Sequence, residues 1–146
     1  MKVVLDTNIW LDWLVFGDPG IAALRAAFEE GRIEIFIDEA CEAELARVLG
    51  YTLQKKILDA ASQQACMAEC RRIARRIVPG KGQAAQAPLA GLPKCRDADD
   101  QKLLEAAAAA GAEVLVTKDL ALLELAGAVE KRALSFRIVK PDSLGF

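Results

Sequence analysis

The sequence contains no histidine among its 146 residues. Catalysis by Ser-His-Asp or Cys-His groups is therefore excluded, as is RNA cleavage by a histidine base. The four cysteines form no Cys-x-x-Cys pair, which argues against a zinc site built from thiolates. The sequence contains no Gly-x-Gly-x-x-Gly motif and no P-loop, which argues against a nucleotide-binding role. Any hydrolytic chemistry must rest on carboxylates, lysines, metal ions or water.

Long apolar runs are also missing. No uncharged apolar stretch approaches the roughly 18 residues that a membrane-spanning helix needs. The N-terminus opens directly into an apolar strand pattern, without the pattern of a signal peptide. A chain of this length typically forms one domain with its own core. We therefore expect a single domain over residues 1–146, soluble and cytoplasmic.

Charge is unevenly distributed, although the net charge is only −2. Residues 1–50 carry 4 basic and 10 acidic side chains, whereas residues 51–81 carry 7 basic and 2 acidic ones. A basic segment beside an acidic one is the arrangement expected of a nuclease, in which cations hold phosphates and carboxylates bind metal. A basic helix that is simply solvated explains the same composition.

Short apolar runs alternate with helical patterns along the chain. Asn8 is the expected N-cap of the first helix, and Gly50 and Gly111 are expected to end later ones. This alternation predicts an α/β fold, a three-layer α/β/α sandwich around a central, mainly parallel sheet. We expect strands over 2–6, 32–37, 112–117 and 136–139, and helices over 9–14, 21–30, 38–49, 52–59, 62–78, 98–110 and 120–125.

Two of the predicted strands end in an aspartate. Asp6 follows the first strand and Asp119 follows the third, with Thr117 placed to orient the Asp119 carboxylate. Ligands of open α/β sheets bind at the carboxyl ends of the strands, so these two carboxylates are expected at one edge. The structural alternatives are an Asx turn at Asp6 and a helix N-cap at Asp119.

Further carboxylates lie on two predicted helices. Asp97 is the expected N-cap of the helix over 98–110. Asp99 is expected to be solvated or to assist its neighbours, and Asp100 lies near the apolar stripe that contains Leu103 and Leu104. On the helix over 38–49, Glu42 and Glu44 flank the apolar stripe on opposite sides. Helical periodicity cannot choose between these two glutamates.

A row of arginines follows on the predicted helix over 62–78. Their spacing forms two adjacent i,i+4 pairs, a broad positive stripe that suits phosphate, with one lysine shortly after it. A solvated face and an acidic protein partner are the alternatives. The candidate nucleic-acid-binding residues are Arg71, Arg72, Arg75, Arg76 and Lys81. Trp10 and Trp13 are three residues apart on an apolar face, which favours a core or interface position.

Four segments together resemble the PIN domain family. They are Val4-Leu5-Asp6-Thr7-Asn8, Glu44-Leu45-Ala46-Arg47-Val48-Leu49, Asp97-Ala98-Asp99-Asp100 with the helix that follows, and Val114-Leu115-Val116-Thr117-Lys118-Asp119. In order and spacing they cover essentially the whole chain. The sequence is most similar to single-domain prokaryotic PIN proteins described as toxins of toxin–antitoxin pairs, the VapC-like ribonucleases.

This resemblance implies a Rossmann-like PIN fold and a ribonuclease that uses Mg²⁺ or Mn²⁺. It places the catalytic and metal-binding carboxylates at Asp6, Glu44, Asp100 and Asp119, choosing Asp100 over Asp97 and Asp99 by the spacing to Gly111. The supporting residues that it implies are Thr7, Asn8, Asp97, Asp99 and Thr117. RNA as substrate, an antitoxin protein and a homodimer are the partners that follow from it.

Two other readings compete with this one. A phosphotransferase of the haloacid-dehalogenase type would use Asp6 as nucleophile, but it needs a second aspartate where this chain has Asn8. A non-catalytic PIN module would use the acidic edge only to bind nucleic acid or protein. RNA binding without cleavage in any divalent metal would favour the module.

Overall fold

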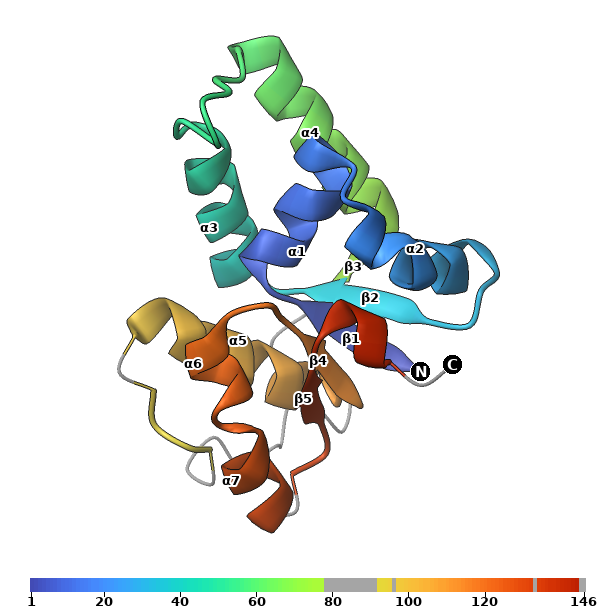
Figure 1. Cartoon of the computed structure of the whole chain (residues 1–146), viewed down its shortest axis with the longest axis vertical. Helices are drawn as coiled ribbons and strands as arrows, with labels where there is room; N and C mark the ends of the chain where they lie inside the picture. The colour runs from blue at the N-terminus through green and yellow to red at the C-terminus, as the bar shows by residue number, and fades with distance from the viewer. Residues whose placement is uncertain (78–91, 96, 133, 145–146) are drawn as a thin grey trace.

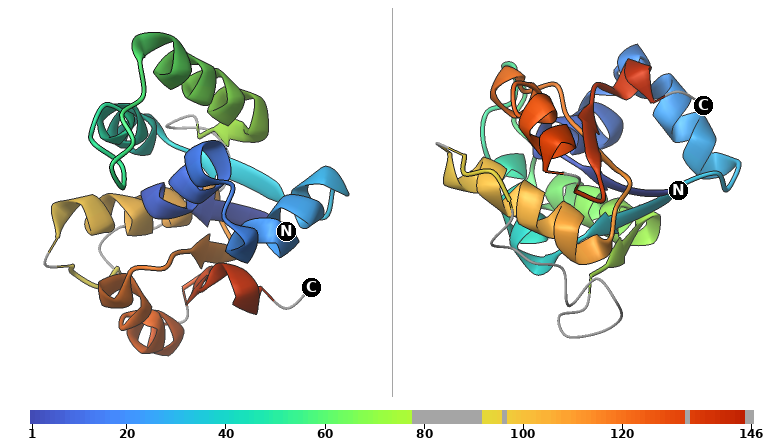
Figure 2. Two further views of the ribbon diagram at one scale, coloured as in Figure 1. Left: turned by 45° about the horizontal axis from the view of Figure 1, so that its top comes forward. Right: turned by 90° about the horizontal axis from the view of Figure 1, so that it is seen from below.

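The computed structural model describes residues 1–77, 92–95, 97–132 and 134–144. Five parallel strands form its sheet, in the order β3-β2-β1-β4-β5. Helices lie on both sides of this sheet (Figures 1 and 2), which confirms the predicted α/β/α sandwich. The strands are β1 (Lys2–Leu5), β2 (Glu34–Ile37), β3 (Ala74–Arg76), β4 (Val114–Val116) and β5 (Arg137–Val139).

The helices connect these strands in the order expected of a parallel sheet. The α-helices are α1 (Thr7–Leu11), α2 (Ala22–Glu29), α3 (Glu39–Leu49), α4 (Ala60–Ile73), α5 (Ala98–Ala110), α6 (Leu120–Leu123) and α7 (Ala126–Lys131). A π-helical turn η1 (Asp12–Phe16) and the short 3₁₀ helices η2 (Pro19–Ile21) and η5 (Pro141–Ser143) complete the described elements. No helix in the described ranges has the length and apolar character needed to cross a membrane.

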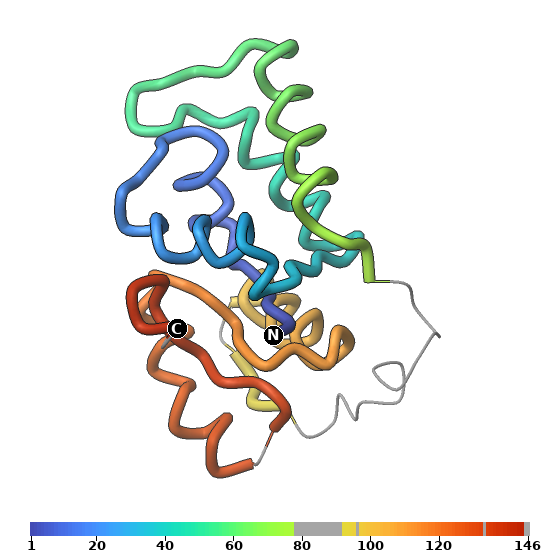
Figure 3. The backbone as a smooth tube through the Cα atoms, turned by 90° about the vertical axis from the view of Figure 1, so that its right-hand side faces the viewer, coloured from blue at the N-terminus to red at the C-terminus, as the bar shows by residue number. Residues whose placement is uncertain are grey.

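The chain divides at the centre of the sheet. The first half of the tube in Figure 3, from β1 to β3, occupies the upper part of the view, and the second half, from α5 onward, occupies the lower part. The halves meet where β1 pairs with β4, with Val4 beside Leu115. Every residue of β4 is buried, as are Val3, Val4 and Leu5 of β1. The sheet centre is therefore the core of the fold.

Three predicted features differ from the structure. Asp6, not Asn8, is the N-cap of the first helix, and its side chain accepts a hydrogen bond from the Thr7 amide. Residues 52–59 are not helical. They contain a tight turn bridged between Leu53 and Lys56, in which Gln54 and Lys55 have positive φ angles. The predicted helix over 62–78 ends at Ile73, where the chain enters the unpredicted edge strand β3.

The third difference changes the interpretation of the arginines. Arg71 and Arg72 belong to α4, whereas Arg75 and Arg76 belong to β3, so the four do not form one helical stripe. All four are also ion-paired, Arg72 with Glu69, Arg75 with Glu34, and both Arg71 and Arg76 with Glu42. Three glutamates thus offset most of their charge. Lys81, the fifth candidate, lies outside the described residues.

Candidate active site

The carboxyl ends of β1 and β4 carry two aspartates joined through one threonine. Thr117 is fully buried, and its hydroxyl donates a 2.6 Å hydrogen bond to Asp6 Oδ2. The same Thr117 oxygen accepts a 2.9 Å hydrogen bond from the Asp119 amide. Thr117 therefore orients the Asp6 carboxylate and the Asp119 backbone, whereas the sequence analysis assigned it to the Asp119 carboxylate.

Asp6 and Asp119 are both helix N-caps, so their structural and candidate functional roles coincide. Asp6 Oδ1 accepts from the Thr7 amide at 2.6 Å, and Asp119 Oδ1 accepts from the Ala121 amide at 2.9 Å. Asp6 is only 7% exposed. Burial raises the pKa of Asp6, the hydrogen bonds from Thr117 and Thr7 oppose this, and the nearby charges of Asp119 and Asp97 raise it further.

Asp100 lies in the first turn of α5. As predicted, Asp97 is the N-cap of this helix, accepting a 2.8 Å hydrogen bond from the Asp99 amide. Asp100 is buried, and its pKa is raised to about 6 by burial and then by the negative charges of Asp119, Asp97, Asp6 and Asp99. Crowding of like charges of this strength is typical of functional sites and is resolved when a cation binds.

The four candidate carboxylates line one cleft of about 270 Å³ between α3 and α5. Glu44 reaches it from α3, and its buried Oε2 atom pairs with the Arg47 guanidinium. Asn8 belongs to the same lining, and its Oδ1 atom is buried without accepting a hydrogen bond. The remaining lining residues are Thr7, Leu11, Cys41, Val48, Asp99, Lys102 and Leu103. Sequence reasoning missed Lys102, although its i,i+3 spacing from Asp99 was a usable signal.

The Cys41 thiol lines the cleft but stays protonated at neutral pH, which makes it a poor nucleophile. Burial and the neighbouring Asp38 raise the pKa of Cys41 far above its usual range. The Cys41 amide is instead held by Asp38 Oδ1 at 2.8 Å, as part of the N-cap of α3. The reactive groups of this cleft are therefore its oxygens.

Lys118 separates Thr117 from Asp119 but points elsewhere. Its ammonium pairs with the buried Asp12 of η1 and lies 3.9 Å from Asp18 Oδ2. This ion pair connects the loop after β4 to the turn after α1. The loop that carries Asp119 is thereby held from both sides, by Thr117 within the sheet and by Lys118 outside it.

A larger hollow of about 810 Å³ lies away from these carboxylates, between η1, α2 and α4. Its charged residues are Arg25, Glu29, Glu69 and Arg72. Arg72 already pairs with Glu69, so no group of carboxylates without counterions gathers there. The chemistry of the lining, rather than volume, identifies the smaller cleft as the candidate active site.

Glu42 and Glu44 have different surroundings in the structure, which helical periodicity alone could not predict. Glu44 faces the cleft, whereas the buried Glu42 faces α4 and β3 and accepts hydrogen bonds from Arg71 and Arg76. Burial alone would raise the pKa of Glu42, but the hydrogen bonds from the two arginines outweigh burial and lower it. Glu42 is therefore a structural residue that fastens α3 to α4 and to the edge of the sheet.

We expect Glu42→Gln to lower the free energy of unfolding at pH 7 by about 1.5–3 kcal/mol, because hydrogen bonds to a charged group are lost. Since the pKa of Glu42 is lowered on folding, this loss should shrink as the pH falls below its ordinary value. Urea unfolding of Glu44→Gln is the matched control. Glu44 pairs with the half-exposed Arg47, so its replacement should cost at most about 1 kcal/mol. Equal decreases in the free energy of unfolding for Glu42→Gln and Glu44→Gln would contradict the assignment of Glu42 as the structural residue.

Comparison with known proteins agrees with the geometry. A family model described as PIN domain matches residues 2–121. The fold is similar to a chain in the crystal structure of VapBC2 from Rickettsia felis bound to a DNA fragment from their promoter, with a TM-score of 0.61 and 16% identity over 96% of this chain and 98% of that chain. No curated protein matches the sequence. The family match covers most of the chain, including Asp6, Glu44, Asp100 and Asp119, and the chain belongs to the PIN domain family.

Proposed function

We propose that this protein is a divalent-metal-dependent endoribonuclease, in which Asp6, Glu44, Asp100 and Asp119 bind Mg²⁺ or Mn²⁺. One observation carries the proposal. Four carboxylates from separate elements line a single cleft at the carboxyl edge of the sheet, and burial together with the negative charges of Asp119, Asp97, Asp6 and Asp99 raises the pKa of Asp100 to about 6. Charge of this kind is costly unless a cation balances it.

The donor atoms suit the proposed ions. Mg²⁺ and Mn²⁺ prefer oxygen ligands, and the polar cleft residues supply carboxylate, amide and hydroxyl oxygens. The buried Asn8 Oδ1 accepts no hydrogen bond, so it has capacity for a further partner. Glu44 Oε2 is the oxygen that pairs with Arg47, so an ion bound there would compete with Arg47. Within the described residues, no three acidic or cysteine side chains converge on one point in their present rotamers. Ion binding therefore requires side-chain rotation.

Bound metal would lower the pKa of a water molecule and polarise the scissile phosphate. The residues of the chain then have separate roles. Asp6, which is held by hydrogen bonds from Thr117 and Thr7, would be a preoriented ligand, and Asp100, Asp119 and Glu44 would supply the other carboxylates. Asp97 supports the start of α5 by accepting a hydrogen bond from the Asp99 amide. Because the chain has no histidine, proton transfer would fall to water and to the carboxylates of the cleft.

A protein partner is part of the proposal. The similar fold belongs to VapBC2, a complex crystallised with DNA from the promoter, which supports an antitoxin as the partner of this chain. A homodimer is proposed on the family resemblance alone, because Trp10 and Trp13 are buried in the core and cannot form its interface. Copurification of the protein with the product of a neighbouring gene, followed by size-exclusion chromatography with light scattering, tests both.

Incubation with labelled single-stranded and structured RNAs tests the activity. We expect cleavage with Mg²⁺ or Mn²⁺, none with EDTA, and loss of cleavage in Asp6→Asn, because the neutral amide cannot replace a carboxylate ligand. Asp18→Asn is the matched control. Asp18 also caps a short helix, through a 2.7 Å hydrogen bond from the Gly20 amide, but it does not line the cleft.

Two outcomes would contradict the proposal. Cleavage that persists unchanged in Asp6→Asn would assign the activity to another site or to a contaminating nuclease. RNA binding without cleavage by the wild type in all metals tested would instead indicate a non-catalytic PIN module. Loss of cleavage in Asp6→Asn could also follow from changing a helix cap. Normal cleavage by Asp18→Asn, which changes a cap outside the cleft, would argue against that explanation.

A further inference from the structure

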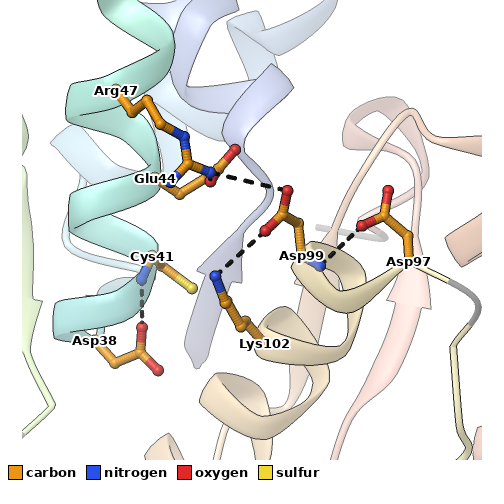
Figure 4. A network of polar contacts seen from close by, with 7 residues as sticks. All are labelled: Asp38, Cys41, Glu44, Arg47, Asp97, Asp99 and Lys102. Carbon is orange, nitrogen blue, oxygen red and sulfur yellow. Dashed lines mark hydrogen bonds and ion pairs between the residues drawn. The ribbon is translucent and has the colours of Figure 1, made fainter.

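Two cations face each other across the mouth of the candidate active site. Arg47 comes from α3 and Lys102 comes from α5, so they belong to opposite walls of the cleft (Figure 4). Asp99 lies between them in the same view. Arg47 lies in one of the segments that resemble the family, but neither cation has a role in the proposed metal chemistry.

A single carboxylate connects the two cations. Asp99 Oδ1 is 3.3 Å from Lys102 Nζ, and Asp99 Oδ2 is 4.0 Å from an Arg47 guanidinium nitrogen. Arg47 also pairs with Glu44, one helical turn earlier on α3. The contacts run from Glu44 through Arg47 and Asp99 to Lys102, from one wall to the other. Lys102 lines the cleft, and Arg47 lies beside it through its pairs with Glu44 and Asp99, while both side chains stay about half exposed.

The charge of the cleft explains why such cations are needed. Its lining contains five acidic side chains, Asp6, Glu44, Asp99, Asp100 and Asp119, and one basic side chain, Lys102. An RNA backbone approaching this opening would be repelled unless cations met it there. The arginines of α4 and β3 are poorly suited to this task, because glutamates offset most of their charge and Glu42 holds two of them on the other side of α3.

We propose that Arg47 and Lys102 form a phosphate-binding pair at the cleft mouth, in which an RNA phosphate replaces Asp99 as their shared counterion. Arg47 can bind phosphate through two hydrogen bonds, and Lys102 adds a mobile positive charge. Because Arg47 also pairs with Glu44, an ion that binds Glu44 competes with Arg47 for that carboxylate. An ion bound at Glu44 would leave Arg47 free to bind a phosphate. This inference rests on the proposed ribonuclease function.

RNA affinity tests the pair. We expect Arg47→Gln and Lys102→Gln each to weaken binding of a short single-stranded RNA about tenfold, as for loss of a hydrogen bond to a charged group. Binding is measured by fluorescence anisotropy in Ca²⁺, and a gel checks that the RNA stays intact. Arg32→Gln is the matched control, since Arg32 is a partly exposed arginine paired with Glu30 just before β2, at the amino edge of the sheet. Arg47→Lys should fall between wild type and Arg47→Gln.

Metal affinity gives a second readout that does not depend on activity. Calorimetric titration with Mn²⁺ alone should show several-fold tighter binding by Arg47→Gln than by wild type, because Glu44 loses its competing partner. Tighter Mn²⁺ binding with unchanged RNA affinity would make Arg47 a counterion only and would overturn the proposal. Failure of the wild type to bind Mn²⁺ would overturn this inference and the ribonuclease together. Normal wild-type binding of Mn²⁺ and RNA, with both glutamine variants equal to Arg32→Gln, would overturn this inference alone.

Discussion

Asp100→Asn is expected to abolish cleavage and, in the absence of divalent ions, to stabilise the protein at pH 7. Even the outer-shell partners of a metal typically contribute roughly 10–100-fold to affinity or activity, so loss of a proposed ligand should cost more. The stabilisation has a separate cause. In the folded protein the ionised Asp100 is buried and repelled by Asp119, Asp97, Asp6 and Asp99, and asparagine keeps the shape without the charge.

The pH dependence of this stabilisation follows from the raised pKa. Asp100 titrates near pH 6 in the folded chain and near its ordinary value of 3.8 in the unfolded chain, so the folded state binds more protons between these values. The unfavourable contribution of Asp100 is therefore complete above pH 6 and disappears as the pH falls towards 4. The advantage of Asp100→Asn, on the order of 1 kcal/mol at pH 7, should shrink over the same range.

Urea unfolding of wild type and Asp100→Asn with EDTA, at pH 7 and at pH 5, measures the stabilisation and its dependence on pH. Asp142→Asn, which changes an exposed carboxylate on η5, is the control and should alter neither stability nor cleavage. Added Mn²⁺ should stabilise the wild type much more than Asp100→Asn. An Asp100→Asn protein that is less stable than wild type without metal would show that Asp100 is not under electrostatic strain.

Thr117→Val should reduce both stability and cleavage, in contrast to Asp100→Asn. Valine preserves the buried volume but removes the donor to Asp6 Oδ2 and the acceptor for the Asp119 amide. Two polar groups would then lose their partner, at a cost of about 1–3 kcal/mol each when fully buried. Cleavage should fall by roughly 10–100-fold, because the threonine orients a proposed metal ligand without touching the metal.

Thr117→Ser distinguishes the contribution of the hydroxyl group from that of the methyl group. Serine keeps both hydrogen bonds and leaves only a small void, so it should retain cleavage near the wild-type rate while losing some stability. Equal cleavage by the valine and serine variants would show that the hydroxyl does not position Asp6. Single-turnover cleavage at saturating Mn²⁺, together with thermal unfolding, distinguishes the two contributions.

The sequence predicted the carboxyl edge of the sheet well because local rules decide it. A buried strand followed by an aspartate and a helical pattern indicates both the end of the strand and the N-cap of the next helix. This holds at Asp119. After the first strand the N-cap is Asp6, two residues before the predicted Asn8. Asp97, Gly50 and Gly111 likewise mark helix ends that depend on neighbouring residues alone. These local signals were sufficient to place Asp6 and Asp119 at one edge of the sheet, whereas the choice of Asp100 over Asp97 and Asp99 came from the spacing of the family resemblance.

The features that sequence reasoning missed depend on distant contacts. Ile73 and Ile77 continue the helical spacing of α4, yet the chain becomes extended because Ala74 pairs with Ile35 of β2. Residues 52–59 have a helix-forming composition, but Asp59 accepts a hydrogen bond from the Ser62 amide and begins a new helix. The choice between Glu42 and Glu44 required the positions of Arg71 and Arg76, which only the folded chain brings to Glu42.

The pairing of β1 with β4 has a consequence for how this protein is synthesised. Asp6 and Glu44 emerge early, whereas Asp100 and Asp119 emerge late, and the hydrogen bond from Thr117 to Asp6 joins residues 111 positions apart. Such distant contacts form late in folding, because a long stretch of chain must first lose its freedom. A nascent chain still on the ribosome therefore carries only half of the site. The proposed ribonuclease would therefore be unable to cut the messenger from which it is being translated until its own synthesis is nearly complete.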